Sequence, residues 1–224
     1  GDFDAQAIET LLKDQFAGWV SKAPYARVDR EYRDVKPVRV VVDTPDKENA
    51  VFRARQEFPL RDDDPDAAAL TIATEILGGG SGLANRLMVR LRQKDGLSYG
   101  VGAGLALGSR ERLASFTISG IAAPQNVNRA EQALREELER ARKEGFTAAE
   151  VDDAKKGLLQ SRLLSRSQDP VVANAWVGNL DLGRTFTFSR QFEDRLRAVT
   201  PAEASAAFRK YIDPAKISIV KAGD

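Results

Sequence analysis

The first apolar positions of the chain recur every three or four residues and are followed by a polar stretch without a period. They are Ile8, Leu11, Leu12, Phe16 and Trp19. This spacing predicts a helix with one buried stripe, which Asp4 caps at its amino end. Residues 22–35 are charged and show no periodicity, so we interpret them as a linker or surface arm. We therefore expect residues 1–36 to be a helix and linker arm, the end of a preceding subdomain.

Two short apolar segments come next, and each predicts a strand with one buried face. The first is the run from Val38 to Val42. In the second, Phe52, Ala54 and Phe58 alternate with polar neighbours.

Two helices are predicted after these strands. The first covers residues 64–78, because an Asp-Pro pair opens it and a glycine ends it. The second is shorter, carries leucines 83, 87 and 91 on one stripe and ends by Gly96.

A glycine-rich strand is predicted to open at Tyr99. Its even-numbered positions up to Gly108 are four glycines and one alanine, so one face is nearly bare backbone. Because glycine weakens a strand interior, we interpret this row as a place where another backbone, a ligand or a packed helix comes close. The predicted pairing partner is the segment 113–121, reached through the charged turn 109–112.

The remainder is mostly helical. Residues 124–143 predict one helix, an Asp-Pro pair at 169–170 begins another, and residues 217–220 predict a last short strand. Thr147 with Glu150, and Thr200 with Glu203, match the capping box that opens a helix. Strands in neighbouring pairs with long helices between them predict an α+β fold, a mostly antiparallel sheet packed against a layer of long helices.

The composition removes several function classes. With 34 basic and 33 acidic side chains the net charge is +1, which gives no field that favours nucleic acid or an anionic membrane. The apolar runs are far shorter than the about 20 residues that span a membrane. The chain has no cysteine and no histidine, so it lacks disulfides, the usual general base and the two commonest zinc ligands. The absence of cysteine fits oxidising and reducing compartments equally.

Two motifs resemble sites but have simpler interpretations. The GGGSG segment lacks the Gly-Lys-Ser/Thr ending of a phosphate loop, so we interpret it as a helix end followed by a flexible turn. Asp62, Asp63 and Asp64, and likewise Asp152 and Asp153, lie at predicted helix starts. Acids there complement the helix dipole, so we interpret them as capping residues.

The segment LRQKDGLSY, residues 91–99, contains the candidate chemistry. It places Arg92 and Tyr99 seven positions apart, across a helix end and a strand start. On an α-helix Arg92 lies near Met88 and Asn85, where its stem can pack while the guanidinium is aimed outward. The simpler interpretation is that both are solvated surface side chains. If the turn brings the two side chains together, both can donate hydrogen bonds to one oxygen atom.

Four motifs in this order resemble the pitrilysin or insulinase family of zinc peptidases, which includes the mitochondrial processing peptidases. They are Ile76-Leu77-Gly78-Gly79-Gly80, Arg86-Leu87, Leu91-Arg92 and Gly96-Leu97-Ser98-Tyr99. The likeness is to the non-catalytic C-terminal half of that family. It extends over most of the chain and is best marked from Asp64 to Tyr99.

The resemblance implies a division of labour between two halves. The family's N-terminal half carries zinc on an H-x-x-E-H motif with a further glutamate, and the C-terminal half closes over it. Residues 37–224 would then be an inactive peptidase-like domain without a metal, and zinc would belong to the missing N-terminal half. Its partners would be that catalytic half, on the same protein or on a paired subunit, and a peptide substrate. The resemblance slightly favours the periplasm over the cytoplasm.

The resemblance also assigns roles to individual residues. Arg92 and Tyr99 are expected to contact the substrate carbonyl and its oxyanion, completing a site on another domain. Gly79, Gly80 and Ser81 are expected to bind substrate beside them.

Two alternatives remain at this point. The second interpretation is a family member kept only as a non-proteolytic scaffold or assembly subunit, and the state of the H-x-x-E-H motif in the other half distinguishes it from the peptidase. An unrelated α+β binding module that uses the glycine-faced strand is the third interpretation.

Overall fold

The computed structural model describes residues 2–45, 47–80 and 84–223. Along the chain, the strands are β1 (Arg39–Val42), β2 (Ala50–Phe58), β3 (Gly100–Ala106), β4 (Ala114–Ala122) and β5 (Ser218–Ala222). The α-helices are α1 (Ala5–Phe16), α2 (Ala67–Gly78), α3 (Val127–Glu144), α4 (Ala148–Ser165), α5 (Asp169–Asp181), α6 (Phe186–Ala198) and α7 (Pro201–Tyr211). Short helices of other types are η1 (Met88–Lys94), η2 (Pro124–Asn126) and η3 (Pro214–Lys216).

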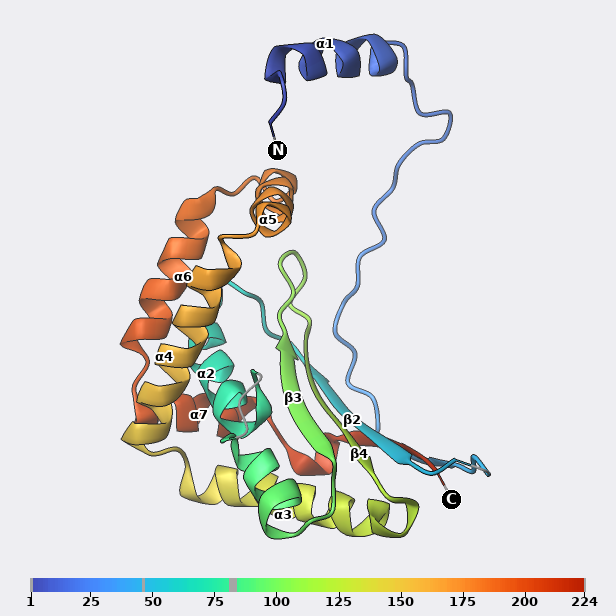
Figure 1. Cartoon of the computed structure of the whole chain (residues 1–224), viewed down its shortest axis with the longest axis vertical. Coiled ribbons are helices and arrows are strands. Elements are labelled where there is room, and N and C mark those ends of the chain that lie inside the picture. Colours follow the sequence, from blue (N-terminus) through green and yellow to red (C-terminus); the bar gives the residue numbers. More distant parts are fainter. Residues whose placement is uncertain (1, 46, 81–83, 224) are drawn as a thin grey trace.

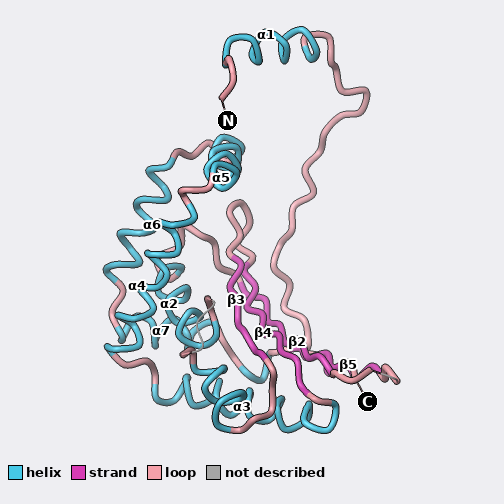
Figure 2. The backbone as a smooth tube through the Cα atoms, viewed as in Figure 1, coloured by secondary structure: helices cyan, strands magenta, loops and turns pink. Residues whose placement is uncertain are grey.

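The strands of the described residues form one five-stranded sheet in the order β1-β5-β2-β4-β3. The pairs β2 with β4, β3 with β4 and β2 with β5 are antiparallel, whereas β1 runs parallel to β5. Helices gather on one side of the sheet, and the N-terminal arm passes its other side (Figures 1 and 2). The predicted α+β fold, a mostly antiparallel sheet against a helical layer, is confirmed.

The core lies between the sheet and the helices. The buried face of β2 is the one that alternation predicts, because Phe52, Ala54 and Phe58 are all less than 5% exposed. Phe116 of β4 packs edge-on against Phe208 of α7. Burial of such aromatic and aliphatic area is the main term that stabilises the layered arrangement.

Helix starts follow the local sequence closely. The Asp4 carboxylate accepts hydrogen bonds from the amides of Gln6 and Ala7 at 2.9 and 3.1 Å, which satisfies donors that have no partner within α1. Both predicted capping boxes are confirmed at the starts of α4 and α7. The pairing of β3 with the segment 113–121 is confirmed as well.

Two predictions of burial are wrong. The apolar residues of α1 and of residues 17–20 are exposed, with Ile8 43% and Trp19 73% exposed, and α1 is held away from the sheet by the arm (Figure 1). All of β1 is exposed too. Periodicity shows that a face suits burial but not which element covers it, and no described residue of this chain buries these faces.

The aspartate groups are not the helix caps that their positions predict. Asp62 forms two hydrogen bonds with Arg184, at 2.6 and 3.0 Å, and Asp63 pairs with Arg61. Asp64 pairs with Arg112 instead of capping α2. Asp152 and Asp153 lie beyond the first turn of α4, which begins at Ala148. Dipole complementarity is weak beyond the first turn, so the position of Asp152 and Asp153 gives them no capping role.

None of the described helices is long and apolar enough to cross a membrane.

Candidate functional site

Arg92 lies on a helix of unusual winding. The segment η1 is a π-helix, in which the Asp95 amide donates to the Arg90 carbonyl at 3.1 Å. The angular position expected for Arg92 assumed 100° per residue and is therefore wrong, because a π-helix has more residues per turn. The Arg92 side chain is exposed and has no hydrogen-bond or ion-pair partner among the described residues. Short π segments of this kind are frequent at functional sites.

Hydrogen bonds join the turn after η1 to strand β4 of the sheet. The Leu91 carbonyl accepts hydrogen bonds from the amides of Leu97 and Ser98, at 2.8 and 3.2 Å. The Ser98 hydroxyl donates to the Ile121 carbonyl at 2.7 Å, and the Tyr99 amide donates to the same oxygen at 2.9 Å. The neighbours of Arg92 and Tyr99 along the chain are thus joined directly. The turn itself passes through Gly96 at φ 61°, a left-handed backbone that glycine adopts without strain.

The Tyr99 side chain is 65% exposed. No hydrogen bond joins it to Arg92 among the described residues, and each side chain is open to a ligand. That the two donate to one oxygen remains a prediction, since the structure fixes their backbones and leaves their donors unoccupied.

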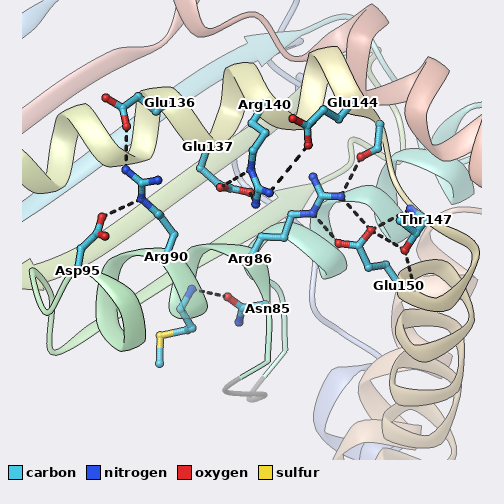
Figure 3. Close-up of polar contacts among 12 residues, drawn as sticks. Asn85, Arg86, Arg90, Asp95, Glu136, Glu137, Arg140, Glu144, Thr147 and Glu150 are labelled. Carbon is cyan, nitrogen blue, oxygen red and sulfur yellow. Dashed lines mark hydrogen bonds and ion pairs between the residues drawn. The ribbon is translucent and has the colours of Figure 1, made fainter.

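Ion pairs brace the segment that leads into η1 (Figure 3). The Arg86 guanidinium donates to the two carboxylate oxygens of Glu150 at 2.6 and 2.8 Å and to the Gly145 carbonyl at 2.8 Å. It also lies 4.9 Å from the centre of the Phe146 ring. Arg90 pairs with Asp95 and with Glu136 of α3, at 2.7 and 2.8 Å. These contacts fix the helix that presents Arg92 against α3 and α4.

Glu150 is the acid that binds Arg86 in this set of ion pairs. Burial by itself raises the pKa of its carboxyl, but hydrogen bonds from Arg86 and from Thr147 outweigh burial and lower the pKa to about 2. The carboxylate therefore stays ionised and bonded to Arg86 throughout the neutral and mildly acidic range.

Gly79 and Gly80 lie against the side chain of Glu75. A Cβ at Gly79 would lie 2.8 Å from the Glu75 Cα, and Gly80 has φ 66°, a left-handed backbone that glycine adopts without strain. Burial raises the pKa of the Glu75 carboxyl. These glycines therefore have a structural reason to lack side chains, and their contact with substrate stays a prediction. Ser81, predicted to bind substrate with them, lies outside the described residues.

The sheet face opposite the helices, called the open face below, is organised in rows across the strands. One row consists of Val42, Ala222, Val51, Ile121 and Gly100. The next row consists of Val40, Val220, Arg53, Ser119 and Gly102. A concavity of about 970 Å³ lies over the middle of these rows.

The close approach of another backbone that the glycine row predicts occurs at two of its four glycines. A Cβ at Gly108 would lie 2.7 Å from the Leu113 carbonyl oxygen, and one at Gly102 would lie 3.4 Å from the Gly78 carbonyl oxygen. A Cβ at Gly100 or Gly104 would meet nothing within 4 Å, so both face open space. A close contact is also made by Gly78 at the end of α2, where a Cβ would lie 2.7 Å from the Ala103 amide nitrogen. Helix α2 approaches β3 through its own terminal glycine, whose carbonyl oxygen lies beside Gly102, while Gly100 and Gly104 face open space.

The residues of this chain do not fit a zinc site. It has no histidine or cysteine, and the residues that the structure describes include no group of three or more acids that could hold a metal ion. Zinc in proteins is held by such ligands.

The comparisons with known proteins place the chain in a family. The family described as "Peptidase M16 inactive domain" matches residues 1–158. The chain therefore belongs to this family, and the resemblance to the non-catalytic half of pitrilysin-type peptidases is confirmed. A comparison with curated protein sequences gave no match.

Solved structures share the fold over the whole chain. The peptidase M16 inactive domain from Pseudomonas fluorescens is 26% identical with a TM-score of 0.79, over 100% of this chain and 52% of that one. A protease from Helicobacter pylori is 16% identical with a TM-score of 0.82, over 100% and 53%. The periplasmic protease PqqL from Escherichia coli is 16% identical with a TM-score of 0.73, over 99% and 24%. The chain thus spans about half the length of the Pseudomonas fluorescens and Helicobacter pylori chains, and 24% of the length of PqqL.

Sequence reasoning missed the surroundings of two arginines. Arg86 belongs to a quoted motif, but its bond to Glu150 joins positions 64 residues apart, which no local pattern predicts. Arg53 alternates with buried residues, which places it on the outer face of β2, but only the register shows which residues surround it.

Proposed function

We propose that this chain is the substrate-contacting, non-zinc-binding half of a zinc metalloendopeptidase that cleaves peptides in a closed chamber formed by two halves. The catalytic half, on the same protein or on a paired subunit, would supply the zinc and the general base. Family membership supports the proposal, as does the absence of histidine from a chain that spans half of its relatives.

In this proposal Arg92 and Tyr99 donate hydrogen bonds to the oxygen of the scissile carbonyl. Zinc in the other half would polarise the same carbonyl. The oxygen gains negative charge as the peptide bond is attacked, so fixed donors stabilise the transition state more than the ground state. A guanidinium brings a permanent positive charge, and a phenol brings a directional O–H donor.

The observation that carries this assignment is the arrangement of the turn between η1 and β3. Backbone hydrogen bonds to the Leu91 carbonyl hold the two residues' neighbours together, while both side chains stay exposed. A surface arginine and tyrosine without a role need no such anchoring, whereas donors that stabilise a transition state must be held in place before the reaction.

Steady-state cleavage of a fluorogenic peptide library by the full-length protein with its catalytic half tests the proposal. Arg92→Ala and Tyr99→Phe are each expected to lower kcat about a hundred- to a thousandfold, the usual effect of losing one oxyanion donor. Arg129→Ala and Tyr25→Phe are matched controls, because both residues are exposed and neither has a partner among the described residues. Near-wild-type kcat in both Arg92→Ala and Tyr99→Phe would contradict the assigned roles.

The alternative function is a non-proteolytic scaffold of the same fold. The ion pairs that join η1 and the segment before it to α3 and α4 stabilise the fold, and a scaffold needs a stable fold as much as an enzyme does. An intact H-x-x-E-H in the other half together with measurable cleavage would exclude it.

The N-terminal segment supports the two-half arrangement. We propose that residues 1–36 are the end of the preceding subdomain and that the exposed apolar face of α1 packs against the missing half. Hydrogen exchange in the full-length protein should then show slow α1 amides, and fast exchange there would count against it. The likeness to a periplasmic protease supports a periplasmic location, which cell fractionation can test.

A further inference from the structure

The open face presents a cation among aliphatic side chains. Arg53 is directly opposite Val220 on β5 and Ser119 on β4. Val51 precedes it by two positions on the same face, and Ile121 is diagonal to it. Val51, Ile121 and Val220 are 41–48% exposed, so Arg53 stands in a partly apolar surface without being buried.

The charge of Arg53 is not balanced within the chain. Its neighbour Arg55 donates a hydrogen bond to Glu57 at 2.7 Å, whereas Arg53 has no ion-pair partner among the described residues. No aspartate or glutamate lines the concavity over the open face. A guanidinium that a ligand encloses binds a carboxylate more strongly than a neutral group. Its parallel N–H donors match the two oxygens of the carboxylate.

The shape of the surface suits an extended chain. The concavity over these rows measures about 970 Å³, which is enough for several peptide residues. At its β3 side, the concavity is lined by Gly100 and Gly102, which present backbone without side chains, and Gly100 has open space in front of it. A peptide backbone can therefore lie close to β3 while its side chains reach the rows that carry Val51 and Arg53.

We infer that the open face binds the peptide substrate in an extended form and that Arg53 selects an aspartate or glutamate side chain of that peptide. The inference rests on the proposed function only in taking a peptide as the occupant. Arg53 acts here as a specificity-determining residue, and the aliphatic side chains around it bind the flanking apolar residues of the peptide.

Binding is measured by fluorescence anisotropy on the full-length protein with its catalytic half, in the presence of a metal chelator so that cleavage does not contribute. The probes are two labelled peptides that differ only in one glutamate replaced by glutamine. The wild type is expected to prefer the glutamate peptide by about tenfold, a preference that falls as salt is added. Arg53→Gln should remove the preference, and Arg53→Lys should restore only part of it.

Arg129→Gln is the matched control, because it removes one exposed cation from α3 on the helix side. It should leave the preference unchanged. Equal affinity of the wild type for both peptides, or a preference that survives Arg53→Gln, would overturn the inference. A preference that depends on a free peptide carboxyl terminus and not on the side chain would also overturn it.

The result is independent of the test of catalysis. Loss of the preference in Arg53→Gln with no effect of Arg92→Ala on cleavage would reject the proposed catalytic roles and uphold the inference. If Arg92→Ala lowers cleavage and Arg53→Gln keeps the preference, the catalytic roles are upheld and the inference is rejected.

Discussion

The Arg86 guanidinium and the Glu150 carboxylate together hold three parts of the helix layer. The guanidinium side chain is 11% exposed and binds Glu150 of α4 and the Gly145 carbonyl between α3 and α4. The same carboxylate accepts from the amide and hydroxyl of Thr147, which closes the capping box of α4. Loss of Glu150 therefore removes a helix cap and leaves a buried guanidinium without its counter-ion.

Glu150→Gln is expected to lower the free energy of unfolding at neutral pH by about 1–2 kcal/mol, a figure reduced for partial exposure. The folded-state pKa of about 2 lies below the ordinary value of 4.5. The stabilisation by Glu150 is thus fully present above about pH 4.5 and is lost as the pH falls towards 2. Urea unfolding at a series of pH values should show that the wild type loses more stability than the variant over this interval.

Glu139→Gln provides the control for this experiment. Glu139 lies on α3, is exposed and has no partner among the described residues, so its variant should follow the wild-type curve. Parallel curves for Glu150→Gln and the wild type between pH 4.5 and 2 would show that the ion pair contributes nothing measurable.

At the scale of elements, α2 and β3 depend on contact at Gly78. A Cβ there would lie 2.7 Å from the Ala103 amide nitrogen and 2.9 Å from its Cβ, so the two backbones approach closely only without a side chain. This contact places the end of α2 beside β3, whose first residue follows Tyr99. The geometry of the candidate site is thus coupled to the packing of a helix.

Gly78→Ala is expected to destabilise the protein by about 1–3 kcal/mol, because the backbone of β3 must shift to admit a methyl group. Gly157→Ala is the matched control within α4, where a Cβ would meet nothing within 4 Å. It should stabilise by up to about 1 kcal/mol through helix propensity. Thermal unfolding compares the two, and a Gly78→Ala variant as stable as the wild type would disprove the close approach.

Elements whose signals are local could be predicted from the sequence. The Asp4 cap, both capping boxes and the alternation around Phe52 depend on residues within a few positions of one another. The π winding of η1 could not be predicted, because the leucine stripe fits an α-helix as well. The exposure of the apolar stripe of α1 could not be predicted either, because periodicity does not show whether another element covers the stripe.

The candidate site was predictable only in part. Arg92 and Tyr99 stand out through a motif within nine residues, and the structure shows both exposed on an anchored turn. Arg53 and the rows of the open face depend on the register of all five strands among the described residues, which no short segment determines. Gly79 and Gly80 have structural explanations that the sequence does not show, namely the backbone of Glu75 beside Gly79 and the positive φ of Gly80.

At the scale of the whole molecule, two observations support the proposal that this chain is one half of an assembly. It spans about half the length of relatives with the same fold, and it leaves α1, β1 and the open face uncovered. Each of these surfaces has exposed apolar residues, which a partner surface or a bound peptide would stabilise by covering them. In the proposed two-half arrangement, a closed chamber would enclose the open face and bring Arg92 and Tyr99 to a substrate.

The most direct test of the central claim compares a transition-state analogue with substrate. A phosphinic peptide mimics the tetrahedral intermediate, so in the full-length protein with its catalytic half Arg92→Ala and Tyr99→Phe should weaken its binding by the same factor as they lower kcat/KM. Binding of the uncleaved substrate should change little. Phosphinic-peptide affinity that is unchanged in both variants would contradict the account, because it would show that neither donor interacts with the developing oxyanion.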